Sequence, residues 1–365
     1  MHRARLRRAR KGFLCWLAAL ILLGCRLSTP GQPAPDQTLP FIPLTASTAG
    51  EWYSVYFTDP GGPASESLSA GPDQSLAEAI GRARLSVDLA VLRLDLWSVR
   101  DALIDAHRRG VGVRLVTDSE YMEEREIQEI IAAGIPVVED RGPGLMHNKF
   151  AIIDRQEVWS GSMNMTVGDA YRNNNNLVRL RSAELAENYT REFEEMFLDG
   201  QFGPDSPSDT PHPALTVEGT LLENYFSPDD RVAARLVELI RSARESIFIM
   251  AFSFTSQDLA SALLERQRAG VRISGVMEAS QVESNIGSQY ERFVAAGLDI
   301  RLDGNPRDMH HKVLVIDRRL VVMGSYNFTV SAERRNDENT LVVDDSGLAA
   351  YFLDEFERLY AQAQK

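Results

Sequence analysis

Residues 147–154 read HNKFAIID, and residues 310–317 read HHKVLVID. Both segments fit the pattern His-x-Lys-x-x-x-x-Asp, and Gly-Ser-x-Asn begins seven residues after each aspartate, at 161–164 and at 324–327. All of these positions repeat at a spacing of 163 residues. A repeat of this length indicates a duplicated domain, because the units of solenoid proteins are far shorter. Two copies of one polar pattern also suggest a single site built from two halves.

The similarity between the halves extends beyond the motifs. Residues 83–84 match residues 243–244 at a spacing of 160, whereas residues 132–134 match residues 295–297 at a spacing of 163. One three-residue difference in length accounts for both spacings. Helices are expected at 75–83, 98–109, 123–133, 183–198, 231–242, 258–269, 286–296 and 346–361.

The expected strands are short and apolar throughout, as in residues 87–92 and 247–252. Such runs are typical of a sheet that helices cover on both faces. After each motif aspartate a tight turn leads into a second apolar run, at 158–160 and at 320–323, so an antiparallel hairpin should make each sheet mixed. We predict an α/β fold of two tandem α/β/α sandwich domains. A pseudo-two-fold axis would relate them and place one active site at their interface.

Composition divides the chain into five parts. The length of 365 residues is enough for two domains of ordinary size. Residues 26–50 are rich in Pro, Ser, Thr, Gly and Gln, and four prolines between 204 and 213 exclude regular structure there. We therefore predict a signal peptide at 1–24, a lipidated cysteine and flexible tether at 25–50, domains at 51–199 and 215–365, and a linker at 200–214.

The first 24 residues have the form of a secretory signal. A basic start is followed by the apolar run 12–24, which is short for spanning a bilayer. The run ends in Leu-Leu-Gly-Cys at 22–25, which resembles a bacterial lipobox with Cys25 as the lipidated residue. An ordinary secretory signal and an uncleaved N-terminal anchor are the alternatives. All three interpretations place the globular part outside the cytoplasm. The lipobox interpretation makes the protein a membrane-anchored lipoprotein of the cell envelope.

Cysteine usage and charge limit the function further. Cys15 and Cys25 are the only cysteines, so the globular part has neither a disulfide nor a cysteine nucleophile. The formal net charge is −13, and removal of the six basic residues of the leader leaves 33 basic against 52 acidic residues. This balance argues against a tight nucleic-acid binder, although a local basic cleft remains compatible with it.

The motif residues suit chemistry at phosphorus. In a strand, side chains two residues apart point the same way, so the histidine and lysine of each motif should project together. One imidazole can attack as a nucleophile, the other can protonate the leaving oxygen, and lysines and asparagines can stabilise the equatorial oxygens. The candidate catalytic residues are His147, Lys149, Asp154, His310, Lys312 and Asp317, and the candidate phosphate-binding residues are Ser162, Asn164, Ser325 and Asn327.

Both motifs, with the Gly-Ser-x-Asn that follows each, resemble the signature of the phospholipase D superfamily, often called the HKD family. The resemblance covers roughly residues 52–365, and the second copy, 309–343, is especially similar to compact bacterial nuclease-type members. It implies a two-step reaction through a phosphohistidine, with His147 as the nucleophile and His310 as the acid. It implies no metal or cofactor, and the sequence shows no carboxylate cluster that would hold a divalent ion.

One pair of positions breaks the symmetry. Members of this type often carry a downstream acid that orients a catalytic histidine, and Glu338 fits that role in the second half. Asn175 stands at the equivalent position of the first half, where an amide oxygen accepts the imidazole N–H but adds no charge. An imidazolium in the first half is therefore expected to be less stabilised, which leaves the roles of the two histidines open.

Two residue types near the motifs have alternative interpretations. For Asp154 and Asp317, holding the hairpin turn is at least as good an explanation as chemistry. His311, next to His310 in a strand, should point away from the site and fill the core or the surface.

The leading hypothesis is an exported phosphodiesterase that cleaves phospholipid head groups. A metal-independent nuclease is the alternative, motivated by the second motif and by the short loops 141–146 and 303–309. A phosphatidyl transferase and a non-catalytic phosphate-binding lipoprotein are further possibilities. The expected partners are a phospholipid substrate and a membrane reached through the N-terminal lipid. A monomer is expected, because both half-sites lie in one chain.

Overall fold

The computed structural model describes residues 52–142 and 144–364. The predicted signal peptide, Cys25 and tether lie outside the described residues. The strands of the first half are β1 (Tyr53–Phe57), β2 (Ser86–Val91), β3 (Gly112–Thr117), β4 (Val137–Glu139), β5 (Lys149–Ile153), β6 (Glu157–Gly161) and β7 (Asn176–Arg181). Its helices are α1 (Pro63–Ser67), α2 (Pro72–Arg82), α3 (Trp97–Arg108), α4 (Arg125–Ala132), α5 (Val167–Tyr171) and α6 (Ala183–Glu194), which a π-helical turn, Glu195–Asp199, extends.

The second half repeats this order with an added strand. Its strands are β8 (Ala214–Val217), β9 (Thr220–Ser227), β10 (Ser246–Ala251), β11 (Arg272–Met277), β12 (Asp299–Leu302), β13 (Lys312–Ile316), β14 (Leu320–Gly324) and β15 (Glu338–Asp344). Its helices are α7 (Val232–Ser242), α8 (Gln257–Arg268), α9 (Ala279–Ser284), α10 (Tyr290–Ala295), α11 (Val330–Arg334) and α12 (Ser346–Gln362).

Each half contains one mixed sheet, as the sequence predicted. Among the described residues the first sheet has seven strands in the order β1-β7-β6-β5-β2-β3-β4, and the second has eight in the order β12-β11-β10-β13-β14-β15-β9-β8. β2, β3 and β4 are parallel, whereas β5 pairs antiparallel with both β2 and β6. The hairpins β5–β6 and β13–β14 confirm the pairing expected after each motif aspartate.

The motif strands β5 and β13 are central in their sheets, and all five residues of each are buried. Burial on both faces explains the continuous apolar runs FAII and VLVI. An alternating pattern would appear if one face met water.

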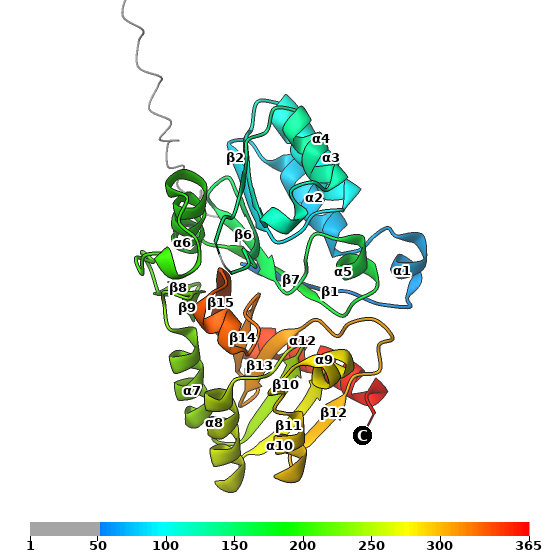
Figure 1. The fold of residues 1–365 in the computed structure, drawn as a ribbon, viewed down its shortest axis with the longest axis vertical. Helices are drawn as coiled ribbons and strands as arrows, with labels where there is room; N and C mark the ends of the chain where they lie inside the picture. The colour runs from blue at the N-terminus through cyan, green and yellow to red at the C-terminus, as the bar shows by residue number, and fades with distance from the viewer. Residues whose placement is uncertain (1–51, 143, 365) are drawn as a thin grey trace, which may run out of the picture. The chain divides into compact units, whose positions relative to one another are not determined.

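Helices cover the outer face of each sheet. In the first half, α2, α3 and α4 pack apolar side chains into one core with β2 and β3, and Figure 1 shows these helices side by side. In the second half, α7, α8 and α10 form the equivalent core with β10 and β11. These two cores stabilise each sheet within its own half.

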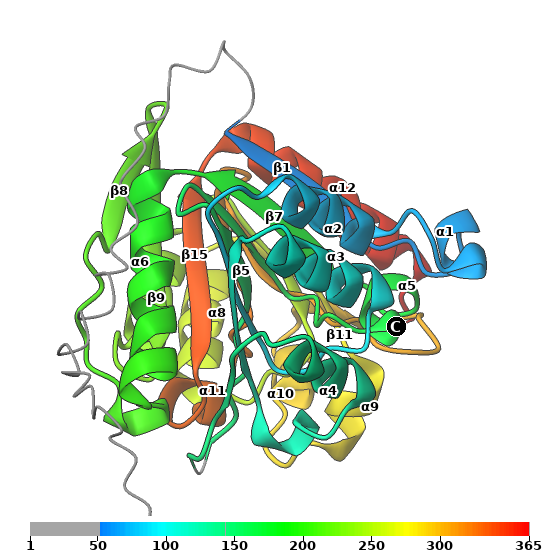
Figure 2. The same ribbon diagram turned by 90° about the horizontal axis from the view of Figure 1, so that it is seen from above.

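The inner faces of the two sheets share a third core. This cluster takes residues from α6 and α12 and from the strands of both halves. The rings of Phe150, Tyr189 and Phe226 form an edge-to-face chain from the first half into the second, with centroids 4.9 and 5.2 Å apart. Figure 2 shows α12 of the second half alongside β1 of the first, and α6 alongside β9. The halves are therefore joined by a common hydrophobic core.

Local capping explains where several helices begin. Ser182 caps α6 by accepting from Leu185 N (3.2 Å), and Asp345 caps α12 by accepting from Leu348 N (2.6 Å). Seven of the eight predicted long helices are present within a few residues at their ends. Of the eighth, predicted at 286–296, only Tyr290–Ala295 is helical. The five-residue helices α5 and α11 were not predicted, because a single turn has no readable apolar period.

In the described part of the chain, no helix has the length and apolarity needed to cross a bilayer.

Candidate active site

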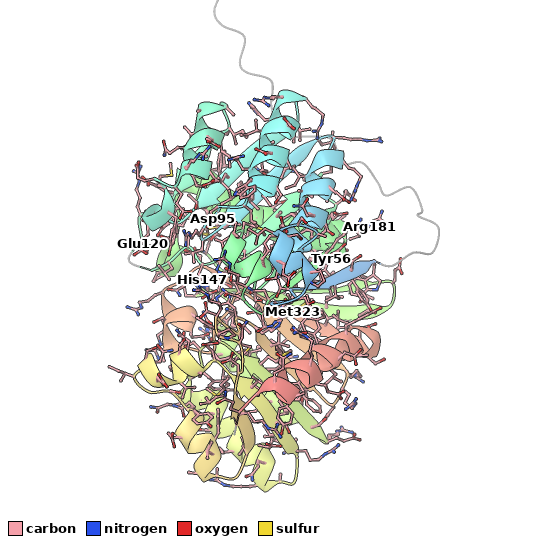
Figure 3. All side chains as sticks on the ribbon, turned by 90° about the vertical axis from the view of Figure 1, so that its right-hand side faces the viewer. Tyr56, Asp95, Glu120, His147, Arg181 and Met323 are labelled. Carbon is pink, nitrogen blue, oxygen red and sulfur yellow. The ribbon has the colours of Figure 1, made fainter. Side chains whose placement is uncertain are left out.

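The chain segments that precede the two motif strands cross from one half to the other. His147 N donates to Asp337 O (3.0 Å), and Asp337 N donates back to Leu145 O (3.0 Å). In the same way, His310 N donates to Asn174 O (2.8 Å). Backbone hydrogen bonds thus hold each motif histidine against the residues just before the last strand of the opposite half, β15 for His147 and β7 for His310. Figure 3 labels His147 at this crossing.

The histidine side chains cross in the same sense. His147 Nδ1 lies 2.7 Å from Glu338 Oε2, and His310 Nδ1 lies 3.0 Å from Asn175 Oδ1. The expectation that Asn175 would serve the histidine of its own half was wrong. The sequence repeat gives only the spacing within each half. The partner of each imidazole comes from the other half because residue 146 pairs with residue 337, and residue 309 with residue 174. His147, not His310, has the carboxylate at hydrogen-bond distance.

Both motif lysines are buried beside the histidines. Lys149 Nζ donates to His147 O (2.7 Å) and Lys312 Nζ donates to His310 O (2.7 Å), and neither residue is more than 2% exposed. Burial lowers the pKa of Lys149 to about 8. Burial, and then the neighbouring charge of Lys149, lowers the pKa of Lys312 well below its ordinary value. Burial and mutual repulsion disfavour the charged forms of the two lysines, and a bound anion would stabilise those charged forms.

The two imidazoles differ in their surroundings. Burial lowers the pKa of His147, but the Glu338 carboxylate opposes that effect. Burial lowers the pKa of His310 well below its usual range, and the charges of Lys312 and Lys149 lower it further. Without a bound anion, His310 is therefore the histidine that holds a proton less readily. Both histidines are only 7% exposed.

Each Gly-Ser-x-Asn begins with a close backbone approach. A Cβ on Gly161 would meet Asn176 O at 2.3 Å, and the φ of Gly161 is +157°. A Cβ on Gly324 would lie 2.2 Å from Asn339 O, with φ at +145°. Only glycine allows this approach and this backbone conformation without strain.

The serines hold strands together within the site. Ser162 Oγ donates to Asn175 Oδ1 (2.8 Å) and accepts from Asn176 N (3.1 Å). Ser325 Oγ accepts from Asn339 N (3.0 Å). Both serines are fully buried. Ser162 holds Asn175, which contacts His310. Ser325 instead holds Asn339, which is next to Glu338 in the chain.

The asparagines of the same motifs are placed differently. Asn164 and Asn327 are partly exposed, yet the Oδ1 atom of each is buried and finds no donor among the described residues. Unpaired buried amide oxygens are costly, so each Oδ1 is open to a hydrogen-bond donor, whereas a phosphate oxygen would be bound by the Nδ2 of the same amide. Their predicted role in binding phosphate stays a prediction.

The motif aspartates lie at the other end of the motif strands. Asp154 accepts backbone N–H bonds from residues 84–86 at 2.7–3.1 Å, and Asp317 accepts from residues 244–246 at 2.7–3.0 Å. Both aspartates have positive φ, at +52° and +51°. Four strand residues separate each aspartate from the lysine of its motif, so the geometry favours the hairpin-holding role over chemistry.

Comparison with known proteins identifies the family. A family model described as "Cardiolipin synthase, PLD-like domain" matches residues 76–197 and 236–360, more than half of the chain. The protein belongs to the phospholipase D superfamily. The two matched segments correspond to the two halves of the fold, so each half is one phospholipase D-like domain.

Similar proteins fall in the same superfamily. Phospholipase D of Rickettsia prowazekii is 34% identical over 128 residues, which are 35% of this chain and 62% of that protein. Human mitochondrial cardiolipin hydrolase is 36% identical over 129 residues, 35% of this chain and 51% of that protein. These matches span less than two thirds of either relative. They support a phosphodiesterase-type enzyme of the superfamily.

One solved structure resembles the whole two-domain arrangement. Phosphatidylserine synthase of Haemophilus influenzae is 12% identical, with a TM-score of 0.66 over 85% of this chain and 89% of that chain. At this identity the likeness concerns the fold alone. It supports the tandem phospholipase D-like architecture.

Sequence reasoning missed a buried polar network behind the phospholipase D motifs. Asn148 Nδ2 donates to Glu192 Oε1 (3.0 Å), and Asn148 Oδ1 accepts from Asn339 Nδ2 (2.9 Å). At the equivalent position, His311 contacts Glu355 through Nε2 (3.0 Å) and Asn176 through Nδ1 (2.9 Å). His311 points away from His310, as predicted, but it links α12 of its own half to Asn176 of the first half. The spacing of 163 residues, which relates Asn148 to His311 and Glu192 to Glu355, was the signal in the sequence that could have revealed this network.

Asp169 was also missed. It lies on α5, is 4% exposed, and its Oδ1 is 3.5 Å from His310 Nδ1. Within the described residues, no group of three or more His, Cys, Asp or Glu side chains is arranged to hold a metal ion.

Proposed function

We propose that this protein hydrolyses phosphodiester bonds of phospholipid head groups through a phosphohistidine intermediate. The carrying observation is the convergence of His147 and His310, one from each half, beside the buried Lys149 and Lys312. Each imidazole uses Nδ1 for an oxygen acceptor, so Nδ1 carries the proton and Nε2 is free to react.

In the first step, His147 Nε2 attacks phosphorus while His310 Nε2–H donates its proton to the leaving oxygen. The P–N bond forms, the P–O bond to the head-group alcohol breaks, and the alcohol leaves with the proton. In the second step, His310 takes a proton from water as the water oxygen attacks phosphorus. His147 is released and phosphatidate forms.

The position of Glu338 supports His147 as the nucleophile. Attack converts the imidazole of His147 into a cationic phosphoimidazole with its proton on Nδ1. A carboxylate 2.7 Å away stabilises that cation. The lysines, with Asn164 and Asn327, would stabilise the charge on the non-bridging oxygens.

A bound phosphodiester would supply negative charge beside His310. Its negative charge would raise the pKa of His310, which burial and two lysines lower in the free protein. His310 would therefore gain its proton when substrate binds and lose it as the leaving oxygen takes it.

The choice of phospholipid rests on the names of the relatives and on charge. The matched relatives are named phospholipase D and cardiolipin hydrolase. A net charge of −13 disfavours the many phosphate contacts of a nucleic-acid binder. A metal-independent nuclease is the second candidate, since the site chemistry is the same for any phosphodiester.

A matched set of substrates tests the proposal. Purified residues 26–365 would be given phosphatidylcholine, phosphatidylglycerol and DNA, each with and without EDTA. We expect release of head group, unaffected by EDTA, and no nicking of DNA. Nicking with intact lipid would show the nuclease, formation of new phosphatidyl alcohols without free phosphatidate would show a transferase, and no turnover would favour a binding protein.

We further propose that the enzyme acts as an exported, membrane-anchored monomer. The supports are the lipobox-like 22–25 and the presence of both half-sites in one chain. In a bacterial host, Cys25→Ala should move the protein from the membrane fraction to the soluble fraction and abolish labelling with radioactive palmitate. Retention in the membrane without label would instead indicate an uncleaved anchor. Light scattering should give the mass of one chain.

A further inference from the structure

The two halves supply their carboxylates to the site from different positions. Glu338 is the first residue of β15, and the equivalent residue of the first half is Asn175. Asp169 is on α5, and the equivalent residue on α11 is Ala332. Each half therefore gives one buried carboxylate to the histidine of the other half. In the first half it comes from the short helix, and in the second half from the start of the last strand.

Asp169 reaches His310 through Asn175. Asp169 Oδ1 accepts from Asn175 Nδ2 (2.9 Å) and from Asn173 Nδ2 (2.8 Å), and it lies 3.5 Å from His310 Nδ1. Asn175 Oδ1 accepts from Ser162 Oγ (2.8 Å) and faces His310 Nδ1 at 3.0 Å. Since the amide nitrogen of Asn175 is engaged by the carboxylate, its oxygen must face the imidazole.

The helix itself does not require this aspartate. Thr166 Oγ1 caps α5 by accepting from Asp169 N (3.1 Å), and Thr329 Oγ1 caps α11 by accepting from Ala332 N (3.2 Å). The carboxylate of Asp169 also accepts from Thr166 Oγ1 (3.3 Å), but the same turn forms with alanine in the second half. The turn alone therefore does not explain a carboxylate at position 169.

We propose that Asp169 is the positioning acid of His310, acting through Asn175, and that it makes His310 the proton-transfer residue while Glu338 makes His147 the nucleophile. This inference rests on the proposed function and assigns the roles within it. Asp169 keeps its own charge throughout, and the proton that moves is the one on His310 Nε2.

Distance and sharing explain why the two acids act differently. Glu338 contacts its imidazole directly at 2.7 Å. The charge of Asp169 is shared among amide donors and reaches His310 at 3.5 Å, so it stabilises an imidazolium less. A strongly stabilised cation suits a covalent phosphohistidine. A weakly stabilised one suits an acid that must give up its proton.

The first test compares two leaving groups in Asp169→Asn. Phosphatidylcholine releases an alkoxide that needs a proton, whereas phosphatidyl-p-nitrophenol releases a phenolate that does not. We expect kcat on phosphatidylcholine to fall about 10- to 100-fold, with less than about a threefold change on phosphatidyl-p-nitrophenol, as for loss of general-acid assistance. Asp105→Asn, on the exposed side of α3, is the matched control.

The second test transplants the arrangement of the second half. In Asp169→Ala/Asn175→Glu, a carboxylate would contact His310 directly, as Glu338 contacts His147. The pKa of His310, followed by ¹⁵N NMR, should rise by about one unit over the wild type, and in Asp169→Asn it should fall. Where His310 is the acid, the alkaline limb of the pH–rate profile should move in the same direction.

Equal losses on both substrates, no loss on either, or an unchanged pKa of His310 would each overturn the inference. So would failure of both variants to fold, because Asp169 would then be structural. If the wild-type protein turns over neither lipid, the proposed function fails, but the NMR titration still decides whether Asp169 governs His310.

Discussion

The two halves of this protein share their backbone plan and differ in how they distribute charge. Position for position at a spacing of 163, Lys149 matches Lys312 and the two motif histidines match each other. Glu338, however, matches an asparagine, and Asp169 matches an alanine. Duplication alone would produce two equivalent histidines. The exchange of acids gives them different surroundings within one symmetric frame, which is what a reaction with a nucleophile and an acid requires.

The same contrast appears behind the site. Glu192 and Glu355 occupy equivalent positions on α6 and α12. Burial and neighbouring carboxylates raise the pKa of Glu192 well above its ordinary value. Burial also acts on Glu355, but His311 and Arg358 outweigh it and lower its pKa. Equal backbone positions therefore carry opposite electrostatic costs.

Removing the motif histidines should have the largest effect and separates their roles. His147→Ala should lower kcat by about 10⁴-fold or more and His310→Ala by about 10²–10⁴-fold. On phosphatidyl-p-nitrophenol, His310→Ala should still release about one equivalent of phenolate and hold a covalent adduct on His147, detectable by mass spectrometry. A burst in His147→Ala would exchange the two assignments.

Loss of a ring from the shared core should destabilise both halves together. Tyr189→Ala should reduce the free energy of unfolding by about 3–5 kcal/mol, as for other buried aromatic truncations. Unfolding in urea should show one transition, and its midpoint should shift to a lower urea concentration in the variant. Tyr351→Ala, at a 54% exposed position, is the control and should change little. Two separate transitions, of which only one moved, would contradict a common core.

Neutralising the direct acid should slow the reaction whatever the leaving group. Glu338→Gln keeps the shape but removes the charge that stabilises the cationic intermediate on His147, so we expect about a 100-fold fall in kcat, or about 2.7 kcal/mol. Both phosphatidylcholine and phosphatidyl-p-nitrophenol should be affected. An effect confined to phosphatidylcholine would make Glu338 the partner of the acid instead.

The motif aspartates should affect stability rather than chemistry. Asp317→Ala should cost about 1 kcal/mol, because three backbone N–H groups lose their acceptor but water can replace it at the two that are exposed. Burial opposes ionisation, but those N–H bonds lower the pKa of Asp317 overall. Its contribution should be full above the ordinary aspartate pKa, about 3.9, and lost as pH falls through the lower native value.

Thermal melts of wild type and Asp317→Ala between pH 2 and pH 7 test this prediction. The two curves should converge at the acid end, while kcat per folded molecule at pH 7 stays within about twofold, against the orders of magnitude expected for a catalytic group. A large loss of kcat in a folded variant would return Asp317 to the catalytic residues.

The smallest effect on stability is expected at Glu192 and Glu355, on the helices α6 and α12 of the shared core. Because the pKa of Glu192 is raised, the native state holds its proton where the unfolded chain has released it, and stability falls as pH rises above about 4.3. Glu192→Gln should therefore raise the melting temperature by a few degrees at pH 8 and hardly at pH 4. Glu355→Gln, which breaks contacts with His311 and Arg358, should lower it at pH 7. Equal shifts in both variants would remove the distinction between the helices.

Much of the fold could be read from the sequence because apolar periodicity is local. The long helices, the motif strands and the hairpins that follow them were all predicted. α5 and α11 were not, since five residues give no period, and α5 carries Asp169. The inner core shared by α6 and α12 was not predicted either, because an apolar helix face does not reveal which sheet covers it.

The sequence by itself determined that the chain is duplicated, that histidine, lysine, serine and asparagine recur in register, and that the two copies differ at 175 and 338. These facts depend only on spacing and residue type. The tertiary structure decided which groups meet. It pairs the segment before each motif strand with the other half, so that Glu338 contacts His147 and Asn175 contacts His310. It also places the Asp169 carboxylate at hydrogen-bond distance from Asn175. Hydrogen bonding and electrostatics act over a few ångströms in space, and residues 191 or 135 positions apart in the chain reach that distance only in the folded protein.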